Sequence, residues 1–173
     1  MQHALRTYIR LITTLNRWLF QLAAALMLII VPVMLYEVTS RYVLNAPTTW
    51  GMELAVLLFG PYFLLGGPYL MHIGGHVNLD IVRRRLAPLP GRILDSINFT
   101  VIILFCSILM YYSWPLAVQA FEYKETTFSA WNPPLWPYKF TVPVAAALLG
   151  LQTLAEFIHI WLDPTARYKE EIA

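Results

Sequence analysis

Few side chains in this sequence could do chemistry, and those few lie near the ends of long apolar runs. Glu37 and Arg41 are four residues apart, the spacing at which side chains meet on one face of a helix. Glu53 follows soon after a short turn at residues 45–47 and Trp50, so the three charges can gather with Arg41 between two carboxylates. No nucleophile accompanies them, which argues against catalysis. The pattern predicts either a clamp at the ends of two helices or a contact with a partner subunit.

Four ionisable side chains elsewhere raise the question of a metal or haem site. His72 and His76 are four residues apart, which could suit a metal, but no third ligand is evident. A haem bound by two histidines would normally take them from different helices, so we interpret this pair as interfacial. Glu156 and His159 share a helix face near the end of the last apolar run, which predicts either a local pair that reaches toward lipid headgroups or a functional role for these intramembrane residues. The lone Cys106 excludes an internal disulfide and a cysteine-based metal motif.

A basic segment joins the second and third apolar runs. Its apolar residues recur every three or four positions, which predicts one apolar stripe on a helix. We therefore expect a short amphipathic helix at about residues 78–87, lying at the membrane surface, with an ordinary basic loop as the alternative. Arginines beside the stripe could reach phospholipid phosphates. The stripe consists of Leu79, Val82, Leu86 and Leu89. Arg83 and Arg85 flank it, and Arg84 lies nearly opposite it.

The connection between the third and fourth runs is rich in aromatic residues and proline. Trp and Tyr prefer the depth of the lipid headgroups, so an aromatic belt explains most of them. A proline-stiffened aromatic segment could also be a docking surface for a protein outside the membrane, with Trp131 and Trp136 as contact residues. The segment contains Phe121, Tyr123, Phe128, Trp131, Trp136 and Tyr138, with Pro133, Pro134 and Pro137.

The elements that must position these residues are transmembrane helices. Hydrophobic residues make up 58% of the sequence and charged residues 13%, and the mean hydropathy is +0.57. A soluble domain has about a quarter charged residues, so lipid must cover the excess apolar surface. A helix crosses the hydrocarbon layer in about 20 mostly apolar residues. We expect an all-α integral membrane protein, a four-helix transmembrane bundle forming one domain over residues 1–173, with spans at about 18–40, 50–71, 97–120 and 136–162.

Glycines recur along the second span. Gly60, Gly67 and Gly74 are seven residues apart, so they lie close to one face of a helix. Small residues on such a face allow another helix to approach closely. That helix would belong either to the same bundle or to a larger partner.

Basic residues are distributed unequally between the two sides of the membrane. Positive charge favours the cytoplasmic side, so the richer side predicts that both termini are cytoplasmic. The first apolar run is longer than the roughly 7–15 residues of a signal peptide, so we expect it to remain uncleaved. The nine residues of the richer side are Arg6, Arg10, Arg17, Arg83, Arg84, Arg85, Arg92, Arg167 and Lys169, and the three of the other side are Arg41, Lys124 and Lys139.

Several function classes are excluded or disfavoured. The sequence has no glycine-rich phosphate loop for ATP hydrolysis, no clear inverted repeat with two broken spans, and a net charge of only +2, too small to suggest nucleic acid. These observations favour an accessory membrane subunit that is not an enzyme and needs no cofactor. A haem-bearing or quinone-linked anchor of a redox enzyme, using His72, His76 or His159, is the alternative. A small exporter built from four-span dimers is a third possibility, although Glu37 lies near the end of its span.

Three motifs together resemble a known family. They are Glu37-x-x-x-Arg41-Tyr42-x-x-Asn45-x-Pro47-x-x-Trp50-x-x-Glu53, then Gly75-His76-Val77-x-x-Asp80, then Pro133-Pro134-x-Trp136-Pro137. Their order and spacing resemble the small membrane subunit of TRAP transporters, the DctQ-like family, over essentially the whole chain. The family's second acidic residue beside Glu53 is replaced here by Met52 or Leu54.

The resemblance implies a function and partners. Such a subunit pairs with a large multi-span membrane subunit that carries the solute and sodium sites and moves as an elevator. A periplasmic solute-binding protein delivers an organic-acid anion to the outer face of the pair, in the inner membrane of a bacterium. The small subunit would be a static scaffold that helps docking. Arg41, Trp50 and Glu53 would then lie near partners at the outer face, and His76 and Asp80 at the inner helix.

Overall fold

Four long helices make up almost all of the described structure. The computed structural model describes residues 2–73 and 88–162, and its helices are α1 (Gln2–Tyr42), α2 (Gly51–His72), α4 (Pro88–Glu122) and α5 (Trp136–Leu162). In these two segments the only β pairing is an isolated bridge between Thr126 and Pro134. The predicted all-α four-helix membrane bundle is therefore confirmed. The amphipathic helix predicted at residues 78–87 lies outside the described residues.

All four helices are long and apolar enough to cross a membrane. The predicted spans coincide with α2 to within one residue at each end and with α5 at both ends. In contrast, α1 begins 16 residues before its predicted span and α4 begins nine residues before. Charged residues such as Arg6 and Arg10 end an apolar window but do not end a helix, because arginine has a high helix propensity. The proline at position 88 is also compatible with a helix start, since proline is favoured in the first turn.

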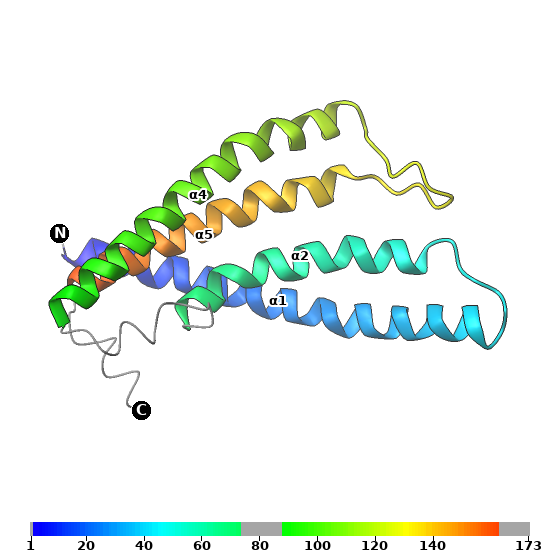
Figure 1. Ribbon diagram of the computed structural model, residues 1–173, viewed down its shortest axis with the longest axis horizontal. Coiled ribbons are helices and arrows are strands. Elements are labelled where there is room, and N and C mark those ends of the chain that lie inside the picture. The colour runs from blue at the N-terminus through cyan, green and yellow to red at the C-terminus, as the bar shows by residue number, and fades with distance from the viewer. Residues whose placement is uncertain (1, 74–87, 163–173) are drawn as a thin grey trace.

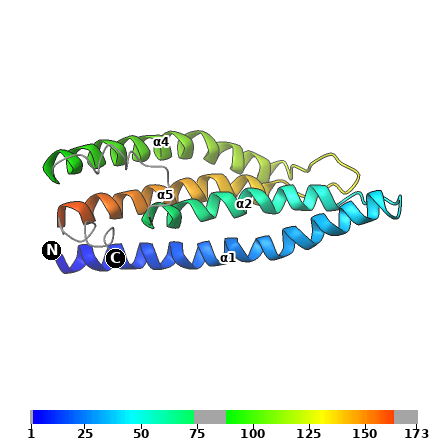
Figure 2. The ribbon, with the colours of Figure 1, turned by 60° about the horizontal axis from the view of Figure 1, so that its bottom comes forward.

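The helices form two antiparallel pairs, α1 with α2 and α4 with α5 (Figure 1). We call the end that holds the start of α1 and the end of α5 the terminal end, and the opposite end, with the connections at 43–50 and 123–135, the loop end. Helix α5 contacts α4, α2 and α1, so it is the central helix of the bundle. The two pairs diverge toward the loop end in Figure 1, and Figure 2 shows α5 and α2 lying between α4 and α1.

Small residues fill the helix contacts, while many large apolar side chains face outward. Ala117, Ala120 and Ala155 are completely buried, whereas Leu28 is 77% exposed. This pattern is expected when the solvent is lipid, because burying a large apolar side chain then brings no hydrophobic gain and close backbone approach dominates. The described cluster of buried apolar residues, Met71, Phe99 and Ile160, joins α2, α4 and α5 near the terminal end.

One glycine of the second span explains how α2 and α5 approach each other. A Cβ atom at Gly60 would lie 2.4 Å from Cε2 of Tyr138, so only glycine fits without a shift of that ring. Gly60 therefore packs within this chain's own bundle, as one of the two interpretations predicted. A Cβ at Gly67 would meet no atom within 4 Å, and Gly74 lies outside the described residues.

Candidate functional site

The turn between α1 and α2 contains a buried carboxylate at the loop end. Glu37 is 2% exposed, and its Oε1 accepts hydrogen bonds from Nε of Arg41 at 3.0 Å and from Nη2 of the same residue. Its Oε2 accepts from the backbone N–H of Thr48 at 3.3 Å and from the Thr48 hydroxyl. Four donors thus satisfy both carboxylate oxygens. Because Glu37 is so deeply buried, only the 40% exposed side chain of Arg41 could present this pair to a partner.

Gly51, the first residue of α2, packs closely against the Glu37 carboxylate. The N–H of Gly51 donates to the Thr48 hydroxyl at 3.1 Å, and a Cβ on Gly51 would lie 2.9 Å from Oε2 of Glu37. The position therefore requires glycine for close approach. Asn45 has a φ of 49°, the left-handed region in which Asn is tolerated, and it turns the chain between the helices. The ring of Trp50 stacks on Tyr36, with centroids 6.0 Å apart.

Glu53 does not join this cluster, which corrects the expectation that Arg41 lies between two carboxylates. Within the described segments Arg41 forms an ion pair with Glu37 and none with Glu53. Instead, Oε2 of Glu53 accepts a hydrogen bond from the Ser129 hydroxyl at 2.6 Å. Two residues along a helix are about 200° apart around its axis, so Gly51 faces Glu37 while Glu53 faces the opposite side. The spacing of the motif was sufficient to predict the pair of Glu37 and Arg41, but it did not show which way the Glu53 side chain points.

The connection from α4 to α5 is an ordered hairpin, which we call the arm (residues 123–135). Backbone hydrogen bonds join its two sides, from Leu135 to Glu125 at 2.8 Å and from Thr127 to Pro133 at 3.2 Å. At its base Lys139 and Glu125 form an ion pair of 2.5 Å. The two predicted aromatic contacts are equally exposed, Trp131 at 40% on the arm and Trp136 at 39%, and Trp136 also packs edge-on against Phe121 at the helix ends.

A second polar cluster, which joins three helices near the terminal end, was not predicted. Nδ2 of Asn16 donates to Oε1 of Gln152 at 2.8 Å, and Nε2 of Gln152 donates to Oε1 of Glu156 at 3.0 Å. The same Glu156 oxygen is 2.6 Å from Nδ1 of His72. Asn16 and Gln152 are completely buried. The sequence feature that could have indicated this cluster is the spacing of Gln152 and Glu156, which places two polar side chains on one face of an apolar helix.

This cluster corrects the expected local pairing of Glu156 with His159. Glu156 is bonded to His72 of α2, 84 residues away along the chain. Over residues 2–73 and 88–162, no three His, Cys, Asp or Glu side chains are placed to hold a metal ion. The remaining predicted residues of the inner face, which are His76, Asp80, Arg83, Arg84 and Arg85, lie outside the described residues.

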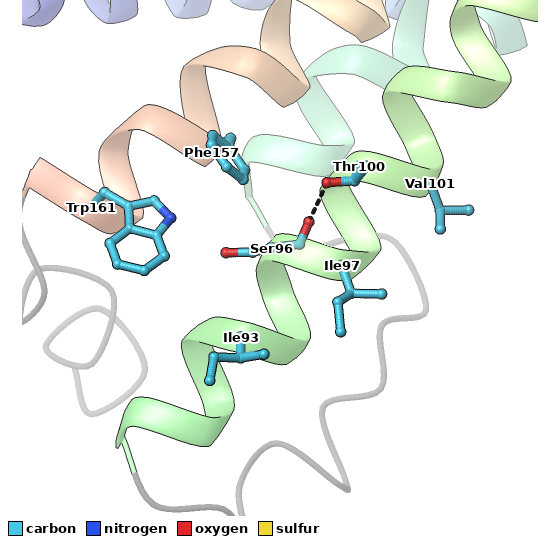
Figure 3. Close-up of a pocket in the computed structure, with 7 residues that line it drawn as sticks. All are labelled: Ile93, Ser96, Ile97, Thr100, Val101, Phe157 and Trp161. Carbon is cyan, nitrogen blue, oxygen red and sulfur yellow. Dashed lines mark hydrogen bonds between the residues drawn. The ribbon is translucent and has the colours of Figure 1, made fainter.

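A shallow groove of about 400 Å³ lies between α4 and α5 near the terminal end (Figure 3). Its two hydroxyls are already used by their own helix, since Thr100 donates to the Ser96 carbonyl and Ser96 donates to the Arg92 carbonyl, both at 2.8 Å. Solute sites combine apolar walls with a few polar groups that fix orientation, and besides these two hydroxyls the side chains lining this groove supply only the indole N–H of Trp161. It is lined by Ile93, Ser96, Ile97, Thr100, Val101, Phe157 and Trp161.

Comparison with models of protein families identifies the family. A family model described as "Tripartite ATP-independent periplasmic transporters, DctQ component" matches residues 30–163. The matched range includes the Glu37 carboxylate, the arm and the α5 side of the polar cluster, but not Asn16. Among curated proteins no relative matches the chain.

Proposed function

The chain belongs to the DctQ family of tripartite ATP-independent periplasmic transporters, and on this premise we propose that it is the static scaffold subunit of a sodium-coupled importer of organic-acid anions. Components of this family work with a large membrane subunit and a periplasmic binding protein. The family match over residues 30–163 is the observation that carries the proposal. Sodium coupling and the anionic solute follow from what the family resemblance implies.

The scaffold role is supported by how the buried polar side chains are used. Glu37 is bonded to its own helix and to the following turn, and Gln152 joins α5 to α1. These contacts fix the turn that follows α1 at the loop end and join α5 to α1 near the terminal end. A fixed frame is what an elevator-type subunit needs, because its mobile part must slide against something that does not move. The large subunit would cover part of the exposed apolar surface of these helices.

We place the loop end outside and both termini in the cytoplasm of a bacterial inner membrane. The excess of basic residues on the side of the termini supports this orientation. The loop end would then meet the periplasmic binding protein, and the proposed contacts there are Arg41, Asn45, Trp50, Glu53, Trp131 and Trp136, with Glu37 acting through Arg41. On the cytoplasmic side His76, Asp80, Arg83, Arg84 and Arg85 are proposed to contact phospholipid headgroups or the inner face.

Reconstitution tests the proposed function directly. Liposomes containing the small chain alone should take up no carboxylate solute. Liposomes with the small chain, its large subunit and the binding protein should show uptake that requires an inward sodium gradient. Uptake by the small chain alone would overturn the proposal, and so would full uptake by the large subunit and binding protein without the small chain.

A further inference from the structure

The centre of the arm presents one aromatic side chain to the surroundings. Phe128 is 88% exposed, the largest exposed fraction among the large apolar side chains of the described residues. Its φ is 53°, a left-handed conformation that bulky residues rarely adopt. An aromatic side chain that is both exposed and held in an unfavourable backbone conformation requires specific support from its neighbours.

Three hydrogen bonds supply that support. The N–H of Phe128 donates to Oδ1 of Asn132 at 3.0 Å, and the N–H of Asn132 donates to the Ser129 hydroxyl at 2.9 Å. The same hydroxyl donates to Glu53 of α2 at 2.6 Å. The centre of the arm is thus connected to a second helix and does not depend on the hairpin alone. The backbone that carries Phe128 is thus held in one conformation, which lowers the entropy cost of ordering the arm on binding.

The position of the arm argues against burial of Phe128 in the hydrocarbon layer. Figures 1 and 2 both show the arm continuing past the ends of α4 and α5. Trp136 and Phe121, which pack together at those ends, mark the depth that aromatic residues prefer at the headgroups. Backbone without regular hydrogen bonding is excluded from lipid-exposed hydrocarbon, so the arm must lie outside it.

We propose that Phe128 is the aromatic anchor by which the arm docks the periplasmic binding protein, inserting into an apolar, uncharged pocket of that protein. This inference rests on the proposed function, which supplies the orientation and the partner. Residues 126–138 contain no charged side chain, so the matching surface is expected to be apolar. Aromatic residues that fill a pocket commonly dominate the affinity of an interface, and a backbone that is already ordered loses less freedom on binding.

The experiment measures binding-protein affinity for the complex of both membrane subunits in lipid nanodiscs. Phe128→Ala should raise the Kd about thirty-fold, as expected for a dominant aromatic contact. Phe128→Trp, which keeps an aromatic ring, should stay within about three-fold of the original Kd. Tyr42→Ala is the matched control, because Tyr42 is 75% exposed at the same end of the bundle, and it should leave the Kd unchanged. The ratio of Kd between Phe128→Ala and the unsubstituted complex should be the same in low and high salt.

The alternative partner of Phe128 is the lipid headgroup layer. A second measurement distinguishes contact with lipid from contact with the binding protein. A fluorophore attached through Phe128→Cys, in a chain carrying Cys106→Ala, should shift its emission when the binding protein is added. Quenching by spin-labelled lipid before that addition would instead assign Phe128 to the membrane and overturn the inference. Equal binding by Phe128→Ala and the unsubstituted complex would overturn it while leaving the proposed function intact. No binding by the unsubstituted complex would contradict the proposed function itself.

Discussion

At the residue scale, buried polar side chains favour one arrangement of the helices over others. Gln152 receives a hydrogen bond from Asn16 of α1 and donates one to Glu156, whose carboxylate contacts His72 of α2. A buried polar group without a partner is costly, so each such pair favours one helix arrangement over others. Interhelical hydrogen bonds in membranes contribute about 0.6 kcal/mol on average and up to about 1.7. The cluster is therefore a modest but specific contribution to the position of α5.

Gln152→Ala should lower the free energy of unfolding in detergent by about 1–2 kcal/mol, because it removes a fully buried side chain with hydrogen bonds to three others, Asn16, Glu156 and Thr13. Gln119→Ala is the matched control, since Gln119 is exposed on α4, and it should have almost no effect. Thermal unfolding of the two purified variants provides the comparison. Equal stability of both would remove the cluster from the interactions that hold α5.

Arg41→Ala should leave the chain inserted but weaken its assembly with the large subunit or the uptake of solute. The substitution removes the cation that is bonded to the buried Glu37 carboxylate. Arg41 is also the exposed member of this pair, so the surface offered to a partner changes. Co-purification of the two membrane subunits and sodium-driven uptake are the measurements. Arg41→Lys keeps the charge but loses the contact through two nitrogens, so its assembly and uptake should lie between those of Arg41→Ala and the unsubstituted chain. Unaltered assembly and uptake in Arg41→Ala would exclude Arg41 as a functional contact.

At the element scale, the contact between α2 and α5 depends on a missing side chain. Gly60 lies against the ring of Tyr138, while the space beside Gly67, one heptad further along the same helix, is open. The two glycines look equivalent in the sequence because they share a helix face. Only the approach of α5 distinguishes them, since it comes close to α2 at one of the two positions.

Gly60→Ala should destabilise the bundle by about 1–3 kcal/mol, because the new methyl group would overlap the Tyr138 ring. Gly67→Ala, the control on the same helix, should be neutral or stabilise by up to about 1 kcal/mol, since alanine has the higher helix propensity. Unfolding of both variants in the same detergent tests the difference. The α2–α5 contact described above would be refuted by a Gly60→Ala variant as stable as Gly67→Ala.

At the scale of the whole molecule, the bundle has two helix pairs that separate toward the loop end and a central helix, α5, that contacts the other three. The connections at the loop end bring α2 and the arm into contact through Glu53 and Ser129. Large apolar side chains cover the outside of α1 and α4. Such surfaces suit lipid and a larger membrane partner, and they agree with a subunit that works inside an assembly.

The proposed orientation predicts which positions are accessible from outside the cell. Tyr42→Cys should react with a membrane-impermeant maleimide in intact spheroplasts, whereas His3→Cys should react only after the membrane is opened. Both residues are exposed, and the native Cys106 is buried, so the background labelling should be low. The reverse labelling pattern would place the loop end in the cytoplasm and remove the periplasmic docking role.

Sequence reasoning predicted the helices and the family but only part of the site. The pairing of Glu37 with Arg41 follows from their i, i+4 spacing, and it is present. The contacts of Glu53 with Ser129 and of Glu156 with His72 join residues 76 and 84 apart along the chain, so no local spacing could indicate these two contacts. The exposure of Phe128 was hidden among several aromatic residues of the same connection.

The sequence by itself determined that this chain spans a membrane as four helices, because the length and composition of each apolar segment are properties of that segment alone. It also determined the family, because the motifs are read in order along the chain. Tertiary structure decided how α5 lies between its neighbours, which glycine meets a ring and which aromatic side chain is presented outward. These depend on which helix faces meet, and that is settled by contacts between residues far apart in the chain.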